Sequence, residues 1–420
     1  MVSETIHMLP LASIMQASGR LKGVAMHTPL IENPYLSELF GCHISLKRED
    51  MQVVRSYKLR GAFNRMAQMS KAEVAKGVVC ASAGNHAQGV AYSCHRLGIG
   101  GKIYMPVTTP KQKIQKVKSF GKNRVEIVLM GDTYDEAYHA AAKDCLENDK
   151  VFIHPFDDPE VMAGQGTVGL EILSDSREPI DFVFIPVGGG GLASGLGSYF
   201  KQISPKTRII GVEPEGAPAM YQSLRQGKVI QLEEIDKFVD GAAVQKVGEK
   251  TFEICREVLD DLLLVPEGKV CATILNLYNE DAIVAEPAGA LAIAALDQYK
   301  TQIQGKRVVC VLSGGNNDIM RMEDIKERAL LYEGLKHYFL IRFPQRAGAL
   351  KEFLTHVLGP NDDITHFEYT KKNNRETGPA LVGIELVSGS DFEGLVQRMK
   401  QYKFNFQLVN DNQMLFNLLV

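Results

Sequence analysis

Apolar positions along the chain recur with two periods, one typical of strands and one typical of helices. After an amphipathic helix at residues 10–23 and an extended segment at residues 27–30, short apolar runs alternate with helical stretches up to residue 312. The pattern predicts strands at residues 44–47, 77–81, 101–105, 125–129, 151–154, 182–187, 208–212 and 307–312. It predicts helices at residues 59–69, 86–97, 111–120, 134–148, 161–173, 192–203, 219–226, 247–258, 269–280 and 289–300. Repeated units of this spacing indicate an α/β fold with mainly parallel, twisted sheets and helices on both faces.

The rhythm changes near residue 320. A charged, helical stretch reaches residue 333, and the pattern beyond it is strand, helix, strand, strand, helix, strand, at residues 335–343, 348–358, 364–369, 380–387, 391–402 and 406–409. This order is typical of a ferredoxin-like α+β domain with an antiparallel sheet. Because 420 residues exceed what one core holds, we expect an α/β region at residues 1–320, a helical connector at 321–333 and a C-terminal domain at 334–420.

Composition narrows the class of protein. The 47 basic and 50 acidic side chains nearly cancel, so we expect neither nucleic acid nor a membrane as partner. The basic run at residues 111–122 has helical spacing and favours a solvated helix face. Seven cysteines without a CxxC pair indicate reduced thiols, not a disulfide framework or a zinc site. Residues 1–10 do not resemble a signal peptide, and no apolar run is long enough for a bilayer, so we expect a cytoplasmic protein.

Lys58 is the first candidate for chemistry. It lies between a strand-like run and a helix start rich in small residues, within Ser56-Tyr57-Lys58-Leu59-Arg60-Gly61-Ala62. A lysine in this setting can be desolvated, lose its proton near neutral pH and attack a carbonyl. A solvated lysine at a helix start is the commoner arrangement, because buried lysines are rare. The stretch by itself leaves both interpretations open.

Four consecutive glycines follow the strand predicted at residues 182–187 and open the next helix, in Pro186-Val187-Gly188-Gly189-Gly190-Gly191-Leu192. They leave backbone N–H groups free at a helix N-terminus, where a phosphate can bind. The run lacks the Lys-Ser/Thr of a Walker loop and is a poor GxGxxG fingerprint. A tight turn that needs positive φ is the alternative. Four glycines are more than a turn requires, which favours anion binding.

Two further polar runs follow predicted strands. Ser82-Ala83-Gly84-Asn85-His86-Ala87-Gln88-Gly89 starts a helix, where small residues and N–H groups can hold a carboxylate and Asn85 can bind a ring oxygen or a carboxylate. Ser82 or Asn85 can equally serve as a helix cap, and His86 fits helix scaffolding better than base catalysis. In Ser313-Gly314-Gly315-Asn316-Asn317, the serine hydroxyl lies where open sheets bind ligands. Alone, this run favours a turn serine.

Together these four motifs, in this order and context, resemble the pyridoxal-phosphate enzymes of the tryptophan-synthase-β type (fold type II). Within that group the sequence is most similar to biosynthetic threonine dehydratase (threonine ammonia-lyase), over nearly the whole chain. The resemblance implies a small domain at about residues 45–150, inserted in a large domain formed by residues 1–44 and 151–320, with the cofactor in the cleft between them. The last domain, with Phe343-Pro344-Gln345-Arg346-Ala347-Gly348-Ala349-Leu350, resembles the single ACT-like regulatory domain of the shorter threonine dehydratases.

The resemblance also implies roles for individual residues. Lys58 would hold pyridoxal 5′-phosphate covalently and, once freed, would act as the general base. Asn85 would contact the ring 3′-oxygen, and Ser313 would meet the pyridine nitrogen. The cofactor phosphate would be cradled by Gly188, Gly189, Gly190, Gly191 and Leu192. The substrate carboxylate would be bound by Ser82, Ala83, Gly84, Asn85 and His86.

The activity implied is the conversion of L-threonine to 2-oxobutanoate and ammonia, the first step of isoleucine biosynthesis. Isoleucine or valine, or both, would bind the C-terminal domain as effectors, and the enzyme would be a homodimer or homotetramer. Related racemases hold a divalent metal with Glu, a carbonyl and Asp. Here Glu213 and Ala217 match, but Ala219 stands at the Asp position, so we predict no metal. Rival functions are a serine dehydratase or serine racemase, or a silent homologue that only senses amino acids.

Overall fold

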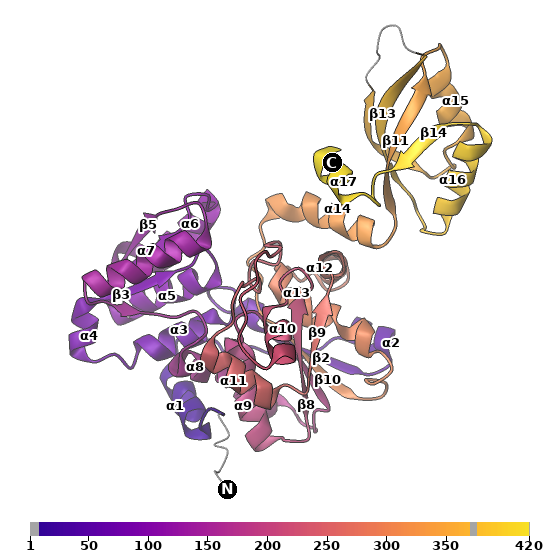
Figure 1. Cartoon of the computed structure of the whole chain (residues 1–420). Coiled ribbons are helices and arrows are strands. Elements are labelled where there is room, and N and C mark those ends of the chain that lie inside the picture. The colour runs from indigo at the N-terminus through magenta and orange to yellow at the C-terminus, as the bar shows by residue number, and fades with distance from the viewer. Residues whose placement is uncertain (1–7, 370–375, 420) are drawn as a thin grey trace. The chain divides into compact units, whose positions relative to one another are not determined.

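The computed structural model describes residues 8–369 and 376–419. Residues 1–7, which hold most of the segment inspected for a signal peptide, lie outside the described residues, as do residues 370–375 and 420. The chain forms two compact units, Met1–Asp318 and Ile319–Val420. Figure 1 shows the element order along both units. The division of the first unit into a small domain and a large domain stays a prediction.

The larger sheet of the first unit has six strands in the order β1-β2-β10-β7-β8-β9. Its strands are β1 (Leu30–Glu32), β2 (His43–Arg48), β7 (Phe182–Pro186), β8 (Arg208–Pro214), β9 (Asp261–Val265) and β10 (Arg307–Leu312). All neighbouring pairs are parallel except β1 with β2. Helices α8 (Pro159–Asp175) and α9 (Gly191–Ile203) cover one face, where Val168 and Leu196 share a core with Val183 and Val311.

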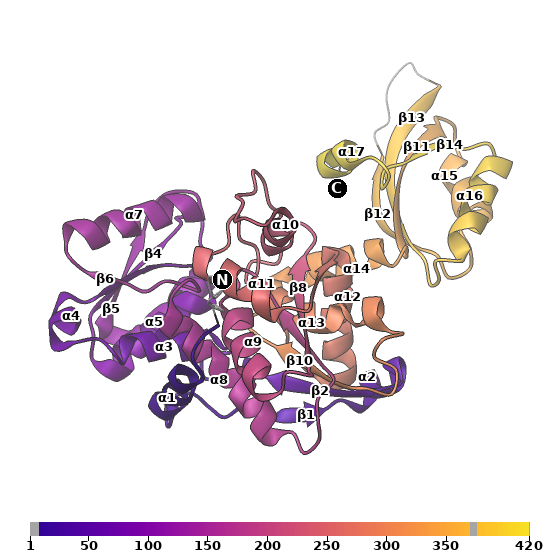
Figure 2. The same ribbon diagram turned by 60° about the horizontal axis from the view of Figure 1, so that its bottom comes forward.

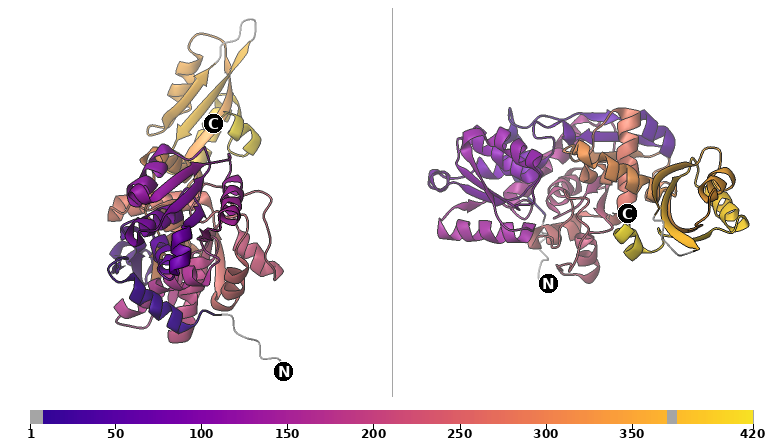
Figure 3. Two further views of the ribbon diagram at one scale, coloured as in Figure 1. Left: turned by 90° about the vertical axis from the view of Figure 1, so that its left-hand side faces the viewer. Right: turned by 90° about the horizontal axis from the view of Figure 1, so that it is seen from above.

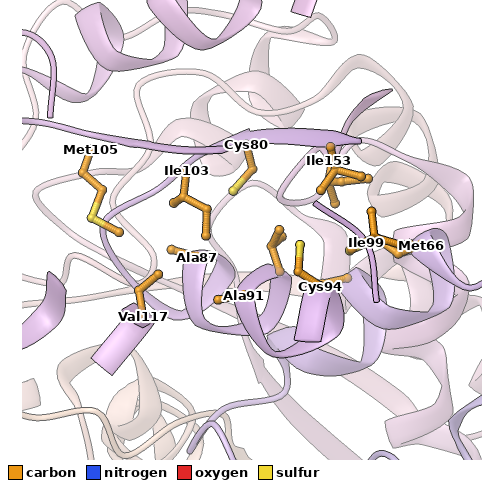
Figure 4. Packing of buried hydrophobic residues seen from close by; sticks show 13 residues of the cluster. Met66, Cys80, Ala87, Ala91, Cys94, Ile99, Ile103, Met105, Val117 and Ile153 are labelled. Atoms are coloured by element: carbon orange, nitrogen blue, oxygen red, sulfur yellow. The ribbon is translucent and has the colours of Figure 1, made fainter. Parts of the chain in front are cut away.

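The smaller sheet has four parallel strands in the order β5-β4-β3-β6, namely β3 (Val78–Ala81), β4 (Gly101–Met105), β5 (Val125–Leu129) and β6 (Val151–Phe152). Figure 2 shows α7 (Tyr134–Glu147) on one face and α5 (Asn85–Leu97) on the other. Alternate side chains of β3 point to opposite faces. Cys80 therefore packs in the core beside α5, where Figure 4 shows it pointing toward Ala87 and Ala91, and Ala81 packs in the core beside α7.

The remaining helices of the first unit connect these strands. They are α1 (Leu11–Leu21), α2 (Pro34–Phe40), α3 (Lys58–Met66), α4 (Lys71–Lys76), α6 (Lys111–Gly121), α10 (Ala219–Gln226), α11 (Glu249–Val258), α12 (Glu267–Asp281) and α13 (Pro287–Ala294). The predicted α/β fold with mainly parallel sheets is confirmed. The sequence pattern missed α2, α4 and both edge strands, β1 and β9. The helix expected at residues 289–300 ends at Ala294, before a short 3-10 turn at Leu296–Tyr299.

The second unit contains a four-stranded antiparallel sheet in the order β12-β13-β11-β14. Its elements are α14 (Met322–Tyr332), β11 (Lys336–Pro344), α15 (Ala349–His356), β12 (Asp363–Tyr369), β13 (Thr377–Glu385), α16 (Asp391–Gln401), β14 (Asn405–Leu408) and α17 (Gln413–Leu419). Helices α15 and α16 pack on one face of the sheet, while α14 and α17 pack on the other (Figure 3). The predicted α+β domain is confirmed, except that α17 was not expected.

Helix α14, the expected connector, is part of the second unit. Its Glu327 carboxylate accepts hydrogen bonds from the buried Lys336 amine and from the Tyr338 hydroxyl, the latter at 2.7 Å. Both partners lie on β11, so these contacts attach the helix to the sheet.

All seven cysteines are free thiols, as expected for a reduced protein. Six of them are buried, and Cys145 is half-buried. Among the described residues, no helix is both long and apolar enough to cross a bilayer.

Candidate active site

The residues singled out in the sequence lie just after the carboxyl ends of parallel strands. The run from Ser82 follows β3, the glycine run follows β7, and Ser313 follows β10. Parallel strands present their carboxyl ends at one edge of a sheet, and open α/β sheets bind ligands there. The segment that carries Lys58 is tied directly to the Ser313 loop, because the Tyr57 N–H donates to Ser313 O at 3.2 Å. The Gly315 N–H donates to Arg55 O at 2.9 Å and adds a second link.

Lys58 is the first residue of α3 and is largely enclosed by protein. Its Nζ donates a hydrogen bond to Pro155 O at 3.0 Å and lies 5.4 Å from the centre of the Tyr57 ring. Desolvation lowers the pKa of the Lys58 amine to about 8, and the Glu286 carboxylate limits this fall. An appreciable fraction of the amine is therefore uncharged near neutral pH, as a nucleophile or base requires.

The glycine run forms a cradle that no side chain can enter. Gly190 has φ of +92°, which favours glycine, and it immediately precedes α9. A Cβ on Gly189 would lie 2.3 Å from Cδ1 of the Phe156 ring, and one on Gly188 would lie 2.9 Å from Ala242 Cα. The first N–H groups of a helix have no partner within it, so the start of α9 presents donors to an anion. Phe156 follows Pro155, whose carbonyl binds Lys58, so the cradle and the lysine share a neighbouring segment.

Asn85 begins α5 and belongs to a polar network. Its Nδ2 donates to Glu286 Oε1 at 2.6 Å, and its Oδ1 accepts from Asn316 Nδ2 at 2.7 Å. Glu286 is buried, and desolvation raises the pKa of its carboxyl to about 7. The Glu286 N–H donates to Gly314 O at 3.1 Å, which places the carboxylate beside the Ser313 loop.

Ser313 is buried, and its hydroxyl donates to Ala288 O at 3.3 Å. Ser82 Oγ accepts from the Gly84 N–H at 3.2 Å, so this serine stabilises the turn before α5. The buried His86 ring contacts Ile153 O through Nε2 at 2.8 Å. Since a carbonyl only accepts, Nε2 carries the proton. Desolvation lowers the pKa of His86 to about 3, so the ring is neutral and acts as scaffolding, as the sequence indicated.

A buried charge cluster, which sequence reasoning missed, lies on the other side of α3. Arg60 follows Lys58 by two positions, so the two side chains leave the helix roughly 200° apart. The Arg60 guanidinium donates to Glu49 at 2.7 and 2.8 Å and to Glu171 at 2.6 and 2.8 Å. Lys47 Nζ donates to Glu171 Oε2 at 2.7 Å. Two cations thus neutralise two carboxylates, and the cluster fixes the rotation of the helix that carries Lys58.

The basic run at residues 111–122 also differs from expectation. Lys111, Lys118 and Lys122 are exposed, as a solvated face predicts. Lys113 turns to Asp240 at 2.6 Å, and the half-buried Lys116 donates to Asn316 Oδ1 at 3.3 Å. The interpretation as a purely solvated face was therefore wrong for these two residues.

Glu213, which matches a metal ligand of the related racemases, is buried near the end of β8. Its carboxylate accepts from the Met220 and Tyr221 N–H groups at 2.9 and 2.7 Å, and so caps the start of α10. Desolvation raises the pKa of this buried carboxyl to about 8. Within the described ranges, no group of three or more His, Cys, Asp or Glu side chains is placed to hold a metal ion.

This arrangement fits a phosphorylated pyridine aldehyde. The glycine cradle offers backbone donors in a space from which side chains are excluded, which suits a phosphate. The Lys58 amine is available for a covalent bond to an aldehyde. The Ser313 hydroxyl is an uncharged partner for a ring nitrogen, and Asn85 is a polar partner for a ring oxygen.

Comparison with known proteins agrees with this geometry. A family model described as "Pyridoxal-phosphate dependent enzyme" matches residues 22–314. The chain therefore belongs to the pyridoxal-phosphate-dependent enzymes, and its cofactor is pyridoxal 5′-phosphate. A second model, described as "C-terminal regulatory domain of Threonine dehydratase", matches residues 327–419.

Individual relatives show which enzymes of this family the chain is similar to. The chain is 61% identical over 412 residues to a biosynthetic L-threonine dehydratase of Halalkalibacterium halodurans, covering 98% of this chain and 99% of the relative. The processed form of threonine deaminase isoform 2 from Solanum lycopersicum is 42% identical with a TM-score of 0.72, covering 77% of this chain and 96% of that one. Maize serine racemase is 30% identical with a TM-score of 0.71, covering 77% and 98%. The same fold therefore accompanies both activities in these relatives.

Glu286 and Asn316 were not identified as site residues from the sequence. Asn316 lies inside the run from Ser313 that drew attention, but nothing in the run distinguishes a structural asparagine from a positioning one. Glu286 directly precedes Pro287 at the start of α13, a place where an acidic residue is expected as a helix-terminal charge. Its contact with Asn85 spans 201 positions, which no local pattern reveals.

Proposed function

We propose that this protein is a threonine dehydratase that converts L-threonine to 2-oxobutanoate and ammonia, and that it serves isoleucine biosynthesis. The observation that carries this proposal is an enclosed Lys58 amine with a pKa of about 8, held beside a glycine cradle at the carboxyl edge of parallel strands. The near full-length similarity to biosynthetic threonine dehydratases supports the substrate and the pathway.

Each site residue has a task in this reaction. Bound pyridoxal phosphate supplies an aldehyde that bonds to amines and a ring that delocalises the electron pair left when the Cα–H bond breaks. Residues 188–192 bind the phosphate through backbone N–H groups at the start of α9. Lys58 would hold the cofactor through its amine, and the free amine would serve as the general base for the α-proton of the substrate. The uncharged Ser313 hydroxyl would be the partner of the ring nitrogen, which would limit electron withdrawal into the ring and favour loss of the β-hydroxyl.

Substrate is held by the turn between β3 and α5. Residues 82–86 bring together small side chains and the start of a helix, where a carboxylate is stabilised by N–H donors. The neutral His86 ring adds no charge to this subsite, because its proton is donated to Ile153 O. Binding of the substrate carboxylate is therefore assigned to backbone donors of the turn.

The direct test measures 2-oxobutanoate from L-threonine with purified, cofactor-loaded protein. We expect turnover by the wild type and none by Lys58→Ala, which keeps the fold but has no base. Threonine-dependent ammonia release at the wild-type rate by Lys58→Ala would refute the role of Lys58. A wild type that binds the cofactor but never turns over threonine would support the rival interpretation of a silent amino-acid sensor.

Serine racemisation is the rival enzyme activity, since a serine racemase shares this fold. Racemisation needs an acid–base group on the ring face opposite Lys58, and Ser82 is the candidate. Its Oγ accepts the Gly84 N–H, which supports a structural task for this hydroxyl instead. Chiral analysis of L-serine incubations separates the activities, because a dehydratase yields pyruvate and a racemase yields D-serine.

The C-terminal unit gives the enzyme feedback control in this proposal, with isoleucine or valine, or both, as effectors. Its match to a threonine dehydratase regulatory domain supports this assignment. Turnover of threonine with and without each amino acid identifies the effector and the sign of its effect. We expect a homodimer or homotetramer, which light scattering on the eluted protein distinguishes. The seven free thiols support a cytoplasmic location.

A further inference from the structure

The amide of Asn316 has only one consistent orientation. Its Nδ2 donates to the backbone carbonyl of Val54 at 2.8 Å and to Asn85 Oδ1 at 2.7 Å. Its Oδ1 accepts from Lys116 Nζ at 3.3 Å. A backbone carbonyl can only accept and a lysine ammonium can only donate. Exchanging the oxygen and nitrogen of Asn316 would therefore place two acceptors together at Val54 and two donors together at Lys116.

The orientation of the Asn316 amide determines the orientation of the Asn85 amide. Because Asn316 Nδ2 donates to it, the atom of Asn85 that faces Asn316 must be the oxygen. The nitrogen of Asn85 then faces Glu286 Oε1 at 2.6 Å, where a carboxylate accepts. An amide nitrogen carries two hydrogens, and one is directed at Glu286. In the part of the chain that the structure describes, Glu286 is the acceptor for Asn85 Nδ2, which leaves the second hydrogen for a ligand.

Glu286 closes the network on the Ser313 loop. Its backbone N–H donates to Gly314 O at 3.1 Å, and Asn85 links the Glu286 carboxylate to Asn316 through the two atoms of its amide. A Cβ on Gly314 would lie 2.1 Å from Glu286 Oε1, so the loop approaches the carboxylate too closely for any other residue. The three side chains come from α5, from the start of α13 and from the loop after β10.

We infer that Asn316 and Glu286 are positioning residues that hold Asn85 as a hydrogen-bond donor toward the ring oxygen of the cofactor. The inference rests on the proposed function and on the resemblance that implies a contact between Asn85 and that oxygen, and it goes further by fixing which atom of the amide is presented. Without Asn316, Glu286 is the remaining partner of the two that orient the Asn85 amide, so the Asn85 nitrogen is held less firmly toward the cofactor. Lys116 supports the arrangement from α6 through Asn316 Oδ1.

The test compares two ligands on apoenzyme, pyridoxal phosphate and its analogue that lacks the 3-hydroxyl group. Dissociation constants come from quenching of tyrosine fluorescence, so the readout does not depend on turnover. We expect the wild type to prefer the natural cofactor about tenfold, the value of one hydrogen bond. Asn85→Ala should lose this preference, and Asn316→Ala should lose a large part of it, with affinity for the analogue unchanged in both variants.

A second pair of variants covers the case in which Asn316→Ala does not fold. Lys116→Gln should reduce the preference two- to threefold, whereas Lys118→Gln, on the exposed face of the same helix, should leave it unchanged. A wild-type preference in Asn316→Ala or Lys116→Gln, beside a lost preference in Asn85→Ala, would overturn the inference while leaving the proposed function intact. A wild-type preference in Asn85→Ala would overturn both this inference and the assignment of Asn85. Threonine turnover by the wild type tests the overall function separately.

Discussion

Replacing Arg60 with leucine should destabilise the first unit severely, and the structure sets the size of the effect. Arg60 is 1% exposed and makes four hydrogen bonds to Glu49 and Glu171. Its removal leaves two buried carboxylates with Lys47 as their remaining cation within the cluster. Breaking a buried pair on one side costs about 3–5 kcal/mol, because the desolvated partner charge is no longer compensated. At roughly 2 °C per kcal/mol, the thermal midpoint should fall by ~6–10 °C.

Scanning calorimetry of the holoenzyme measures this shift, and the same helix offers a control. Arg65 is 21% exposed and pairs with Asp158 at 3.3 Å, so Arg65→Leu should cost less than about 1 kcal/mol. Adding Glu49→Gln to Arg60→Leu should recover part of the loss, because it removes one orphaned charge.

The loss of stability caused by Arg60→Leu should also depend on pH. Arg60 lowers the pKa of Glu171, so this pairing stabilises the fold above the unfolded pKa of about 4.3 and is lost as pH falls through the lower folded value. The orphaned carboxylates of Arg60→Leu can take up protons, so the deficit should shrink from pH 7 toward pH 4. An equal effect of the two arginine variants, or a deficit independent of pH, would refute this reasoning.

Three other predictions concern the cofactor and the C-terminal unit. The rate at which apoenzyme captures pyridoxal phosphate should rise with pH and reach half its maximum near pH 8, since only the uncharged Lys58 amine reacts. Stopped-flow absorbance measures this rate. A half-maximal rate at a pH above 10 would contradict an enclosed amine. Gly189→Ala should weaken cofactor binding at least about tenfold in fluorescence titrations. Adding Phe156→Ala should recover part of that loss if the clash with the ring is the cause. Glu327→Gln should reduce the free energy of unfolding of the C-terminal unit by about 1–3 kcal/mol, because Lys336 would lose its anionic partner; calorimetry measures the change. An unchanged free energy of unfolding would show that solvent replaces the pair.

Local patterns predicted most of the elements, and they marked the candidate site residues, because both kinds of signal depend on neighbours in sequence. Lys58 and Asn85 each begin a helix after a loop, and Ser313 directly follows a strand, which are positions that short motifs mark well. The edge strand β9 was missed because five residues between two helices carry no distinguishing period. Helix α2 was missed although Asn33 caps it and Pro34 is its first residue, since Asn-Pro is equally typical of a turn.

The partners of the site residues could not be predicted in the same way. Glu286 reaches Asn85 across 201 positions, and Arg60 reaches Glu171 across 111. Their pairing depends on how α13 and α8 pack, not on the residues beside them. The half-buried Lys116 was likewise read as solvated, because the helical spacing of its run does not show which side of α6 faces the protein.

Strand β3 separates two cores with alternate side chains, and this has a consequence for tolerated sequence changes. All four of its residues are buried, so neither face of the strand has a spare position. Inserting one residue between Val79 and Cys80 would turn Cys80 and Ala81 to the opposite faces of the sheet and displace the following Ser82 to Asn85 segment. Among natural variants of this enzyme, insertions and deletions should therefore occur in the surface turns and leave the register of this strand unchanged.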